Sequence, residues 1–344
     1  MTTCSETPAP SVPLAAARRA SQAARPLALA AALVAAPLAP SAQGAPPALA
    51  LPIDCALGET CFVQNHVDRD PGPGFADVAC GALGYPGHDG TDFALPDLAA
   101  MAAGVDVLAS APGVVMRTRD GRPDVSVRDP AAPSVAGREC GNGVSLDHGG
   151  GWSTQYCHLA RGSIAVRPGD RVETGDVLGR VGLSGNTEFP HVHLAVRHDG
   201  ETVDPYDASG TACGDGRLDP LWAEPLPYVS TGVTSAGFLE RAPEWGEVKA
   251  GGLVHGGARD APLVLWGQAF GGRAGDAMRL RIEGPGGAVM EGSPTLSRTQ
   301  VAYFFAEGQY PPEGGWPPGR YTGLVEIRRG GAVMDRAETA LTIR

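Results

Sequence analysis

The sequence predicts an all-β protein with two domains behind an N-terminal leader. Gly and Pro are abundant, at 49 and 31 of 344 residues, and aromatic residues make up only 6%. Short apolar runs alternate with turn residues, which is typical of antiparallel strands joined by tight turns. We expect residues 1–43 to be the leader, residues 44–224 an antiparallel β domain, and residues 225–344 an immunoglobulin-like β-sandwich.

The leader has the order of a secretory signal peptide. Arg18, Arg19 and Arg25 precede an apolar run from Leu27 to Leu38, and small residues follow it. The run is well short of the ~20 residues that a membrane-spanning helix needs. The alternative is an Ala/Pro-rich segment that directs no export. We expect no membrane span after leader removal, and a periplasmic or extracellular location.

Charge and cysteine content limit the partners. The net charge of −11 disfavours binding to phosphate groups through bulk electrostatics, so we expect no nucleic-acid partner. Beyond Cys4 in the leader, the even number of cysteines in an exported chain predicts disulfide bonds, although the sequence does not choose their pairing. These cysteines are Cys55, Cys61, Cys80, Cys140, Cys157 and Cys213.

The two domains differ in composition. Seven of the eight histidines and all six of these cysteines precede Glu224, whereas residues 225–344 contain only His255. We therefore expect the boundary near Glu224–Pro227. The second domain contains five strand-like runs and no recognisable catalytic pattern, so it could bind a protein partner or position the first domain. The runs are Leu263–Trp266, Met278–Ile282, Val301–Phe305, Tyr321–Ile327 and Thr339–Ile343.

The first domain also contains several expected strands. Gly143–His148 and Trp152–Leu159 flank three glycines and predict a hairpin. Val105–Ala109 and Val114–Met116 predict two further strands on either side of a Pro-Gly turn. The turn residues within Ile164–Gly182 favour tight hairpins.

Two short histidine patterns are candidates for metal binding. In His191-Val192-His193, residues two apart share a face of a strand, so both imidazoles are expected to point the same way. In His88-Asp89-Gly90-Thr91-Asp92, the glycine argues against a helix and favours a turn that enters a strand at Asp92. Each pattern alone is equally compatible with polar surface residues.

A third histidine lies on the return strand of the glycine hairpin. If that strand is regular, His158 and Tyr156 share one face and Cys157 points away from them, as suits a disulfide cysteine. If His148 lies opposite Trp152, then Asn142 lies opposite His158 and could orient its ring.

Taken together, these patterns predict a catalytic metal site. A catalytic zinc commonly has three protein ligands and one open position. One Asp and two His residues satisfy that count, and two further histidines remain for proton transfer or oxyanion stabilisation.

The order of the motifs resembles the lysostaphin/LytM-type zinc peptidoglycan endopeptidases. HxxxD is followed by the hairpin ending in T-x-Y-x-H-L, by G-D-R-V-E-T-G-D-V-L-G, by Ser184-Gly185 and by HxH, between Gly87 and Pro205. The resemblance implies a duplicated hybrid motif fold. It also implies one Zn²⁺ per chain, held by His88, Asp92 and His193, and two non-ligand catalytic histidines, His158 and His191.

The resemblance also implies the reaction. The expected substrate is bacterial peptidoglycan, cleaved at a peptide bond in its stems or cross-links. The metal is expected to activate a water, and one of the two catalytic histidines to take its proton while the other stabilises the oxyanion. Tyr85 is a candidate for stabilising the transition state. His148 is a candidate for contacting the metal ligands from outside the site. We expect structural roles for His66, His198 and His255.

Other functions are compatible with the same motifs. The chain departs from the simplest members of the family in its cysteine-rich stretch from Cys55 to Cys80 and in its β-rich second domain. It could be a catalytically weak, LytM-like regulator of wall amidases, or a secreted protease that acts on proteins. It could also be an adhesion or sugar-binding protein with a vestigial zinc site.

Overall fold

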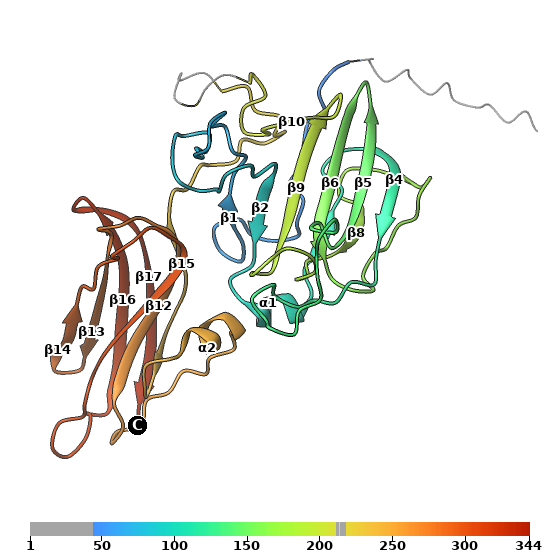
Figure 1. Cartoon of the computed structure of the whole chain (residues 1–344). Helices are drawn as coiled ribbons and strands as arrows, with labels where there is room; N and C mark the ends of the chain where they lie inside the picture. The colour runs from blue at the N-terminus through green and yellow to red at the C-terminus, as the bar shows by residue number, and fades with distance from the viewer. Residues whose placement is uncertain (1–43, 211–212, 214–217) are drawn as a thin grey trace, which may run out of the picture. The chain divides into compact units, whose positions relative to one another are not determined.

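The structure is a computed structural model that describes residues 44–210, 213 and 218–344 (Figure 1). The predicted leader and Cys4 lie outside the described residues. The described part of the chain contains two helices of six residues each, α1 (Leu98–Ala103) and α2 (Trp245–Ala250). Neither has the length or the apolar character that a bilayer-spanning helix requires. Strands dominate the rest, so the predicted all-β class is confirmed.

The largest sheet is antiparallel and has the order β1-β2-β9-β6-β5-β4-β7, with β10 paired to β9. Strands β9, β6, β5 and β4 lie side by side in Figure 1. The strands are β1 (Phe62–Asn65), β2 (Thr91–Ala94), β4 (Gly113–Arg119), β5 (Asn142–Gly149), β6 (Trp152–Leu159), β7 (Arg171–Val172), β9 (His191–His198) and β10 (Glu201–Val203).

The strands within Ile164–Gly182 pair differently from the prediction. β7 pairs with β4, and β8 (Val177–Arg180) forms a separate two-stranded sheet with β3 (Asp106–Leu108). The expected hairpins within Ile164–Gly182 are therefore wrong: its strands pair with partners elsewhere in the chain. The glycine hairpin is confirmed, since β5 pairs with β6.

Alternation along the strands gives this sheet a core face and a polar face. Phe93, Val192 and Leu194 are fully buried in one apolar cluster, which also contains Tyr156 and Trp222. The residues between them on β2 and β9 point to the opposite face, as a two-residue period requires. The core thus fixes which side of the sheet carries the histidines.

The C-terminal residues form two antiparallel sheets around a second apolar cluster. One sheet has the order β11-β12-β15 and the other β14-β13-β16-β17, and their inner faces share core residues such as Leu265 and Val325. All five predicted runs lie in strands. The strands are β11 (Gly232–Leu239), β12 (Leu263–Gly272), β13 (Ala277–Gly284), β14 (Gly287–Gly292), β15 (Gln300–Gln309), β16 (Gly319–Arg329) and β17 (Ala332–Ile343). The division into two domains, with a boundary near Glu224–Pro227, stays a prediction.

Three disulfide bonds confirm the prediction from the cysteine count. They join Cys55 to Cys61, Cys80 to Cys213, and Cys140 to Cys157. In the last of these, Cys140 lies two residues before β5, and Cys157 lies within β6, two residues before its end.

Candidate metal centre

Pairing of β2 with β9 brings the two histidine patterns together. Asp92 is the direct partner of His193, and Ala94 is the partner of His191. Gly90, just before β2, is needed for this approach, because a Cβ atom there would lie 2.6 Å from Nε2 of the His193 ring. The expected turn and strand around the first pattern are therefore present.

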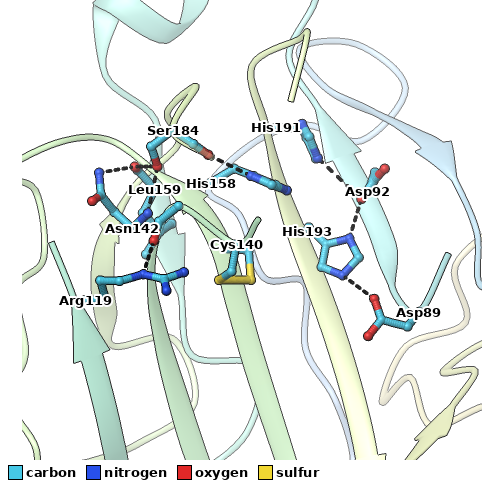
Figure 2. Close-up of a disulfide and its surroundings, with 12 residues drawn as sticks. Asp89, Asp92, Arg119, Cys140, Asn142, His158, Leu159, Ser184, His191 and His193 are labelled. Carbon is cyan, nitrogen blue, oxygen red and sulfur yellow. Dashed lines mark hydrogen bonds and ion pairs between the residues drawn. A yellow bond between two sulfur atoms is a disulfide. The ribbon is translucent and has the colours of Figure 1, made fainter. Parts of the chain in front are cut away.

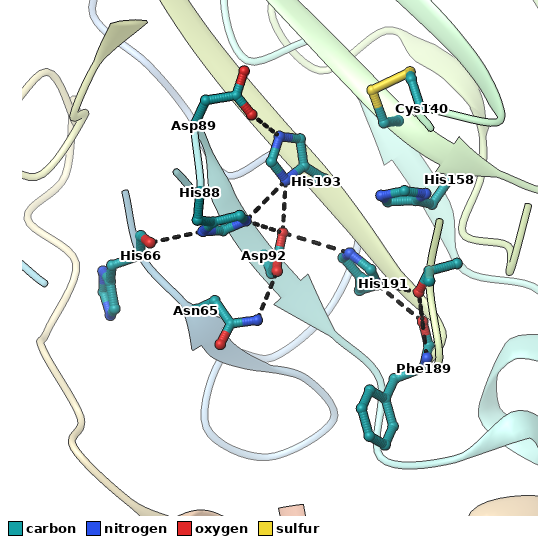
Figure 3. Close-up of polar contacts among 12 residues, drawn as sticks. Asn65, His66, His88, Asp89, Asp92, Cys140, His158, Phe189, His191 and His193 are labelled. Carbon is teal, nitrogen blue, oxygen red and sulfur yellow. Dashed lines mark hydrogen bonds and ion pairs between the residues drawn. A yellow bond between two sulfur atoms is a disulfide. The ribbon is translucent and has the colours of Figure 1, made fainter. Parts of the chain in front are cut away.

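Three buried side chains converge on one point (Figure 3). Nε2 of His88 lies 3.1 Å from Oδ1 of Asp92 and 3.1 Å from Nδ1 of His193, and the last nitrogen lies 2.8 Å from the same oxygen. All three residues are at most 8% exposed. The structure thus brings together the three residues that the sequence predicts as ligands.

The outer contacts of the two imidazoles decide which atoms carry lone pairs. Nδ1 of His88 lies 2.7 Å from the carbonyl oxygen of His66, so it must donate. Nε2 of His193 lies 3.3 Å from Oδ1 of Asp89, which also only accepts. In the neutral rings, Nε2 of His88 and Nδ1 of His193 are therefore acceptors. Two lone pairs and a carboxylate oxygen face one another, an arrangement that a cation stabilises.

Electrostatics agree with a cation at this point. Burial lowers the pKa of His193, but hydrogen bonds to Asp89 and Asp92 outweigh it and raise the pKa to about 9. Burial alone raises the pKa of Asp92, yet His88 and His191 hold it well below its usual range. Either a proton or a metal can supply the positive charge. One oxygen and two imidazole nitrogens form a donor set that suits zinc and similar divalent metals.

Asp89 is held by a second partner. Its Oδ2 accepts a hydrogen bond of 2.6 Å from Nη2 of Arg197, while Oδ1 faces His193. A carboxylate that accepts from the outer nitrogen of a ligating histidine fixes the ring and raises its basicity. Sequence reasoning did not single out Asp89, although it lies inside the HxxxD pattern.

The two remaining histidines lie beside this point, on the same side of the sheet (Figure 2). The rings of His158 and His191 are 4.6 Å apart. Nδ1 of His158 donates to the carbonyl oxygen of Ser184 at 2.8 Å, and Nδ1 of His191 donates to that of Phe189 at 2.9 Å. Burial, together with the nearby His191 and His193, lowers the pKa of His158 well below its usual range, so this ring is neutral at pH 7.

The strand around His158 is not regular, which corrects two predictions. Tyr156 lies in the core, where its hydroxyl accepts from the Ser110 amide, so it does not share a face with His158. His158 has a positive φ of 63°, which breaks the alternation and turns its ring to the polar face. Cys157 does form a disulfide, as expected, but it pairs with His193 across the strands and therefore shares its face.

Asn142 does not contact the His158 ring. Bulges in the β5–β6 pairing place it opposite Leu159, and its side-chain amide donates to the carbonyl oxygens of Leu159 and Arg122. The suggested hydrogen bond from Asn142 to His158 is therefore wrong, because it assumed an unbroken register. Asn142 instead holds the end of the strand that carries His158.

A cavity opens onto the candidate centre. Asp92, His158 and His191 line it, together with Tyr85 and the loop Asn186–Phe189. The Tyr85 ring lies 4.6 Å from the His88 ring and is 49% exposed. His158 and His191 are therefore accessible from this cavity.

The other histidines lie outside the cavity. His148 contacts the carbonyl oxygen of Pro112 and the hydroxyl of Thr154 and does not support the centre. His198 stacks on Trp152, and His255 approaches Gly237. His66 also lies outside the cavity, but its carbonyl oxygen orients His88. The sequence carries no signal for a role played by a backbone atom.

The fold and these side chains together form a candidate metal site. Residues 86–205 match peptidase family M23. The match confirms the resemblance that the order of the motifs predicted.

Several known proteins are similar to parts of the chain. Over 125 residues the chain is 35% identical to the peptidoglycan DD-endopeptidase ShyA of Vibrio cholerae, an overlap of 36% of this chain and 23% of ShyA. Over 120 residues it is 34% identical to the DD-carboxypeptidase/endopeptidase Mpg of Neisseria meningitidis, covering 34% and 22%. The chain thus spans less than a quarter of the length of these relatives. Among solved structures, a peptidase M23 from Pseudomonas aeruginosa is 27% identical, with 47% and 51% covered and a TM-score of 0.28.

Proposed function

We propose that the protein is a zinc metalloendopeptidase that hydrolyses peptide bonds in the stems or cross-links of bacterial peptidoglycan. The observation that carries the proposal is the group of three buried lone-pair donors beside two further histidines in a substrate-accessible cavity. This group lies inside the family M23 domain, and the named relatives ShyA and Mpg are peptidoglycan peptidases.

His88, Asp92 and His193 are the proposed ligands of one Zn²⁺. The fit rests on the lone pairs of the two rings, which face each other across 3.1 Å with no donor between them. When bound, the ion would supply an activated water and polarise the scissile carbonyl. The outer contacts to His66, Asn65 and Asp89 already hold the three ligands in place.

His158 is the proposed general base. Its lowered pKa keeps the ring neutral, and its Nδ1 is occupied by the Ser184 carbonyl, so Nε2 is free to accept a proton. His191 is the proposed oxyanion partner. Its ring lines the cavity beside His158, and its Nε2 lies 3.5 Å from Oδ1 of Asp92.

The organisation and location follow from the same proposal. Residues 44–224 would form the catalytic domain, and residues 225–344 a β-sandwich that positions it or binds a protein partner. Three disulfide bonds and an expected export signal favour the periplasm or the cell exterior, where peptidoglycan lies.

The experiment is digestion of purified peptidoglycan by zinc-loaded residues 44–344, followed by mass spectrometry of the fragments. His193→Ala, which lacks one ligand, is the control. Conversion of cross-linked fragments to monomers by the intact protein alone supports the proposal, and the fragment masses identify the bond. Unchanged fragments despite one bound zinc per chain would refute this activity and favour the regulator or the protein-directed protease.

A further inference from the structure

The segment before the family M23 domain touches the candidate centre at two points. Asn65 ends β1 and His66 follows it, whereas the family match begins at residue 86. β1 pairs with β2, and in this pairing Asn65 is the direct partner of Asp92. A bulge between Val63 and Asn65 interrupts the regular register at this point. The strand therefore turns the Asn65 side chain onto the face that carries the proposed ligands.

The Asn65 side chain contacts the one carboxylate among those ligands. Its Nδ2 donates a buried hydrogen bond of 2.8 Å to Oδ2 of Asp92 (Figure 3). The other oxygen, Oδ1, then faces the nitrogens of His88 and His193. With Oδ2 engaged, the carboxylate cannot rotate freely about its Cβ–Cγ bond. Asn65 thus selects the oxygen that is presented to the centre.

The next residue contacts a second ligand through its backbone. The carbonyl oxygen of His66 accepts from Nδ1 of His88 at 2.7 Å, and the His66 amide donates to the Leu83 carbonyl at 2.8 Å. The His66 side chain is fully buried, and its ring lies against those of Tyr206 and Tyr228 at 4.7 and 5.2 Å. This packing holds the backbone of the segment at a fixed position behind the ligands.

The amide of Asn65 lowers the stability of the fold. Its Oδ1 is buried and has no hydrogen-bond partner among the described residues. An unpaired buried acceptor is destabilising, so an apolar side chain of similar shape would suit this position better if packing were its only task. The donor group on Nδ2 is therefore the feature that the position requires.

We propose that Asn65 is a positioning residue of the metal centre, which fixes Asp92 from outside the family M23 domain. The cysteine-rich stretch is then part of the centre and not a separate appendage. This inference rests on the proposed metal site, although it does not depend on which bond is cleaved. Partners that orient ligating carboxylates and histidines commonly change metal affinity by about 10- to 100-fold when removed.

The test compares Asn65→Leu with a matched control, Gln268→Leu. Like Asn65, Gln268 is buried, donates one hydrogen bond through its amide and has an unpaired amide oxygen among the described residues. It donates to the Pro96 carbonyl, however, and does not line the cavity of the centre. Zinc affinity is measured by competition with a chromophoric chelator. The absorption spectrum of the Co²⁺-loaded protein reports the geometry of the ligands independently of activity.

We expect zinc to bind Asn65→Leu about 10- to 100-fold more weakly than the parent protein, with a shifted Co²⁺ spectrum, and Gln268→Leu to match the parent. Equal affinity for the parent and Asn65→Leu, or an equal loss in both variants, overturns the inference. A parent protein that binds no zinc overturns both the inference and the proposed function. A parent that binds zinc but leaves peptidoglycan intact overturns the proposed function alone, because the affinity difference remains measurable.

Discussion

Removal of the Cys140–Cys157 disulfide should weaken the fold and the activity but not zinc binding. The bond closes a segment of 17 residues, and a loop of that length restricts the unfolded chain by about 3 kcal/mol. It also lies directly beside His158, whose amide donates to the Cys140 carbonyl at 2.8 Å and whose φ is positive. Without the bond, this conformation loses a constraint that a non-glycine residue needs.

The assay is urea unfolding of Cys140→Ala/Cys157→Ala, with zinc content and peptidoglycan cleavage measured on the same preparation. We expect the free energy of unfolding to fall by about 3 kcal/mol, cleavage to fall at least about tenfold because His158 is released, and zinc to stay at one equivalent. The matched control is Cys55→Ala/Cys61→Ala, whose separation of 6 residues predicts a loss of about 2 kcal/mol with activity retained. Unchanged cleavage in the first variant, or equal loss of cleavage in both, would refute the role of this bond in holding His158.

Three further predictions concern the proposed metal ligands. Asp89→Asn keeps the size of the side chain but removes its charge, so zinc affinity should fall about tenfold in chelator competition, and an unchanged affinity would exclude Asp89 as a partner of His193. Because the pKa of His193 is about 9 in the metal-free protein, zinc binding below that pH must displace a proton from this ring. The apparent affinity for zinc should therefore rise about tenfold per pH unit from 7 to 8.5 and level off above 9. A flat pH profile would contradict the assignment of His193 as a ligand. Gly90→Ala places a Cβ atom 2.6 Å from the His193 ring, so the folded variant should bind zinc at least about tenfold more weakly, and parent-like binding would show that the turn can adapt.

Local patterns predicted the parts of the centre that depend on strand alternation. His191 and His193 do share a face, because two-residue spacing on a regular strand allows nothing else. Asp92 does enter a strand after Gly90, since glycine disfavours a helix there. The grouping of His88, Asp92 and His193 was expected from the family resemblance, and the structure brings the three side chains together.

Features that depend on irregular backbone or on distant pairing could not be predicted. The positive φ of His158 turns its ring to the opposite face from the one that alternation predicts. The bulges in the hairpin displace Asn142 by one position. Asn65 contacts Asp92 only because β1 pairs with β2, 27 residues further along the chain, and no local pattern encodes that pairing.

The most direct test of the central claim is to measure bound zinc and peptidoglycan cleavage on the same samples of His193→Ala and His158→Ala. His193 contributes a lone pair to the proposed site, whereas His158 contacts the Ser184 carbonyl and faces the cavity. We predict that His193→Ala loses both zinc and cleavage, while His158→Ala keeps one zinc per chain and loses most cleavage. Loss of zinc from His158→Ala as readily as from His193→Ala would contradict the division between metal ligands and catalytic histidines.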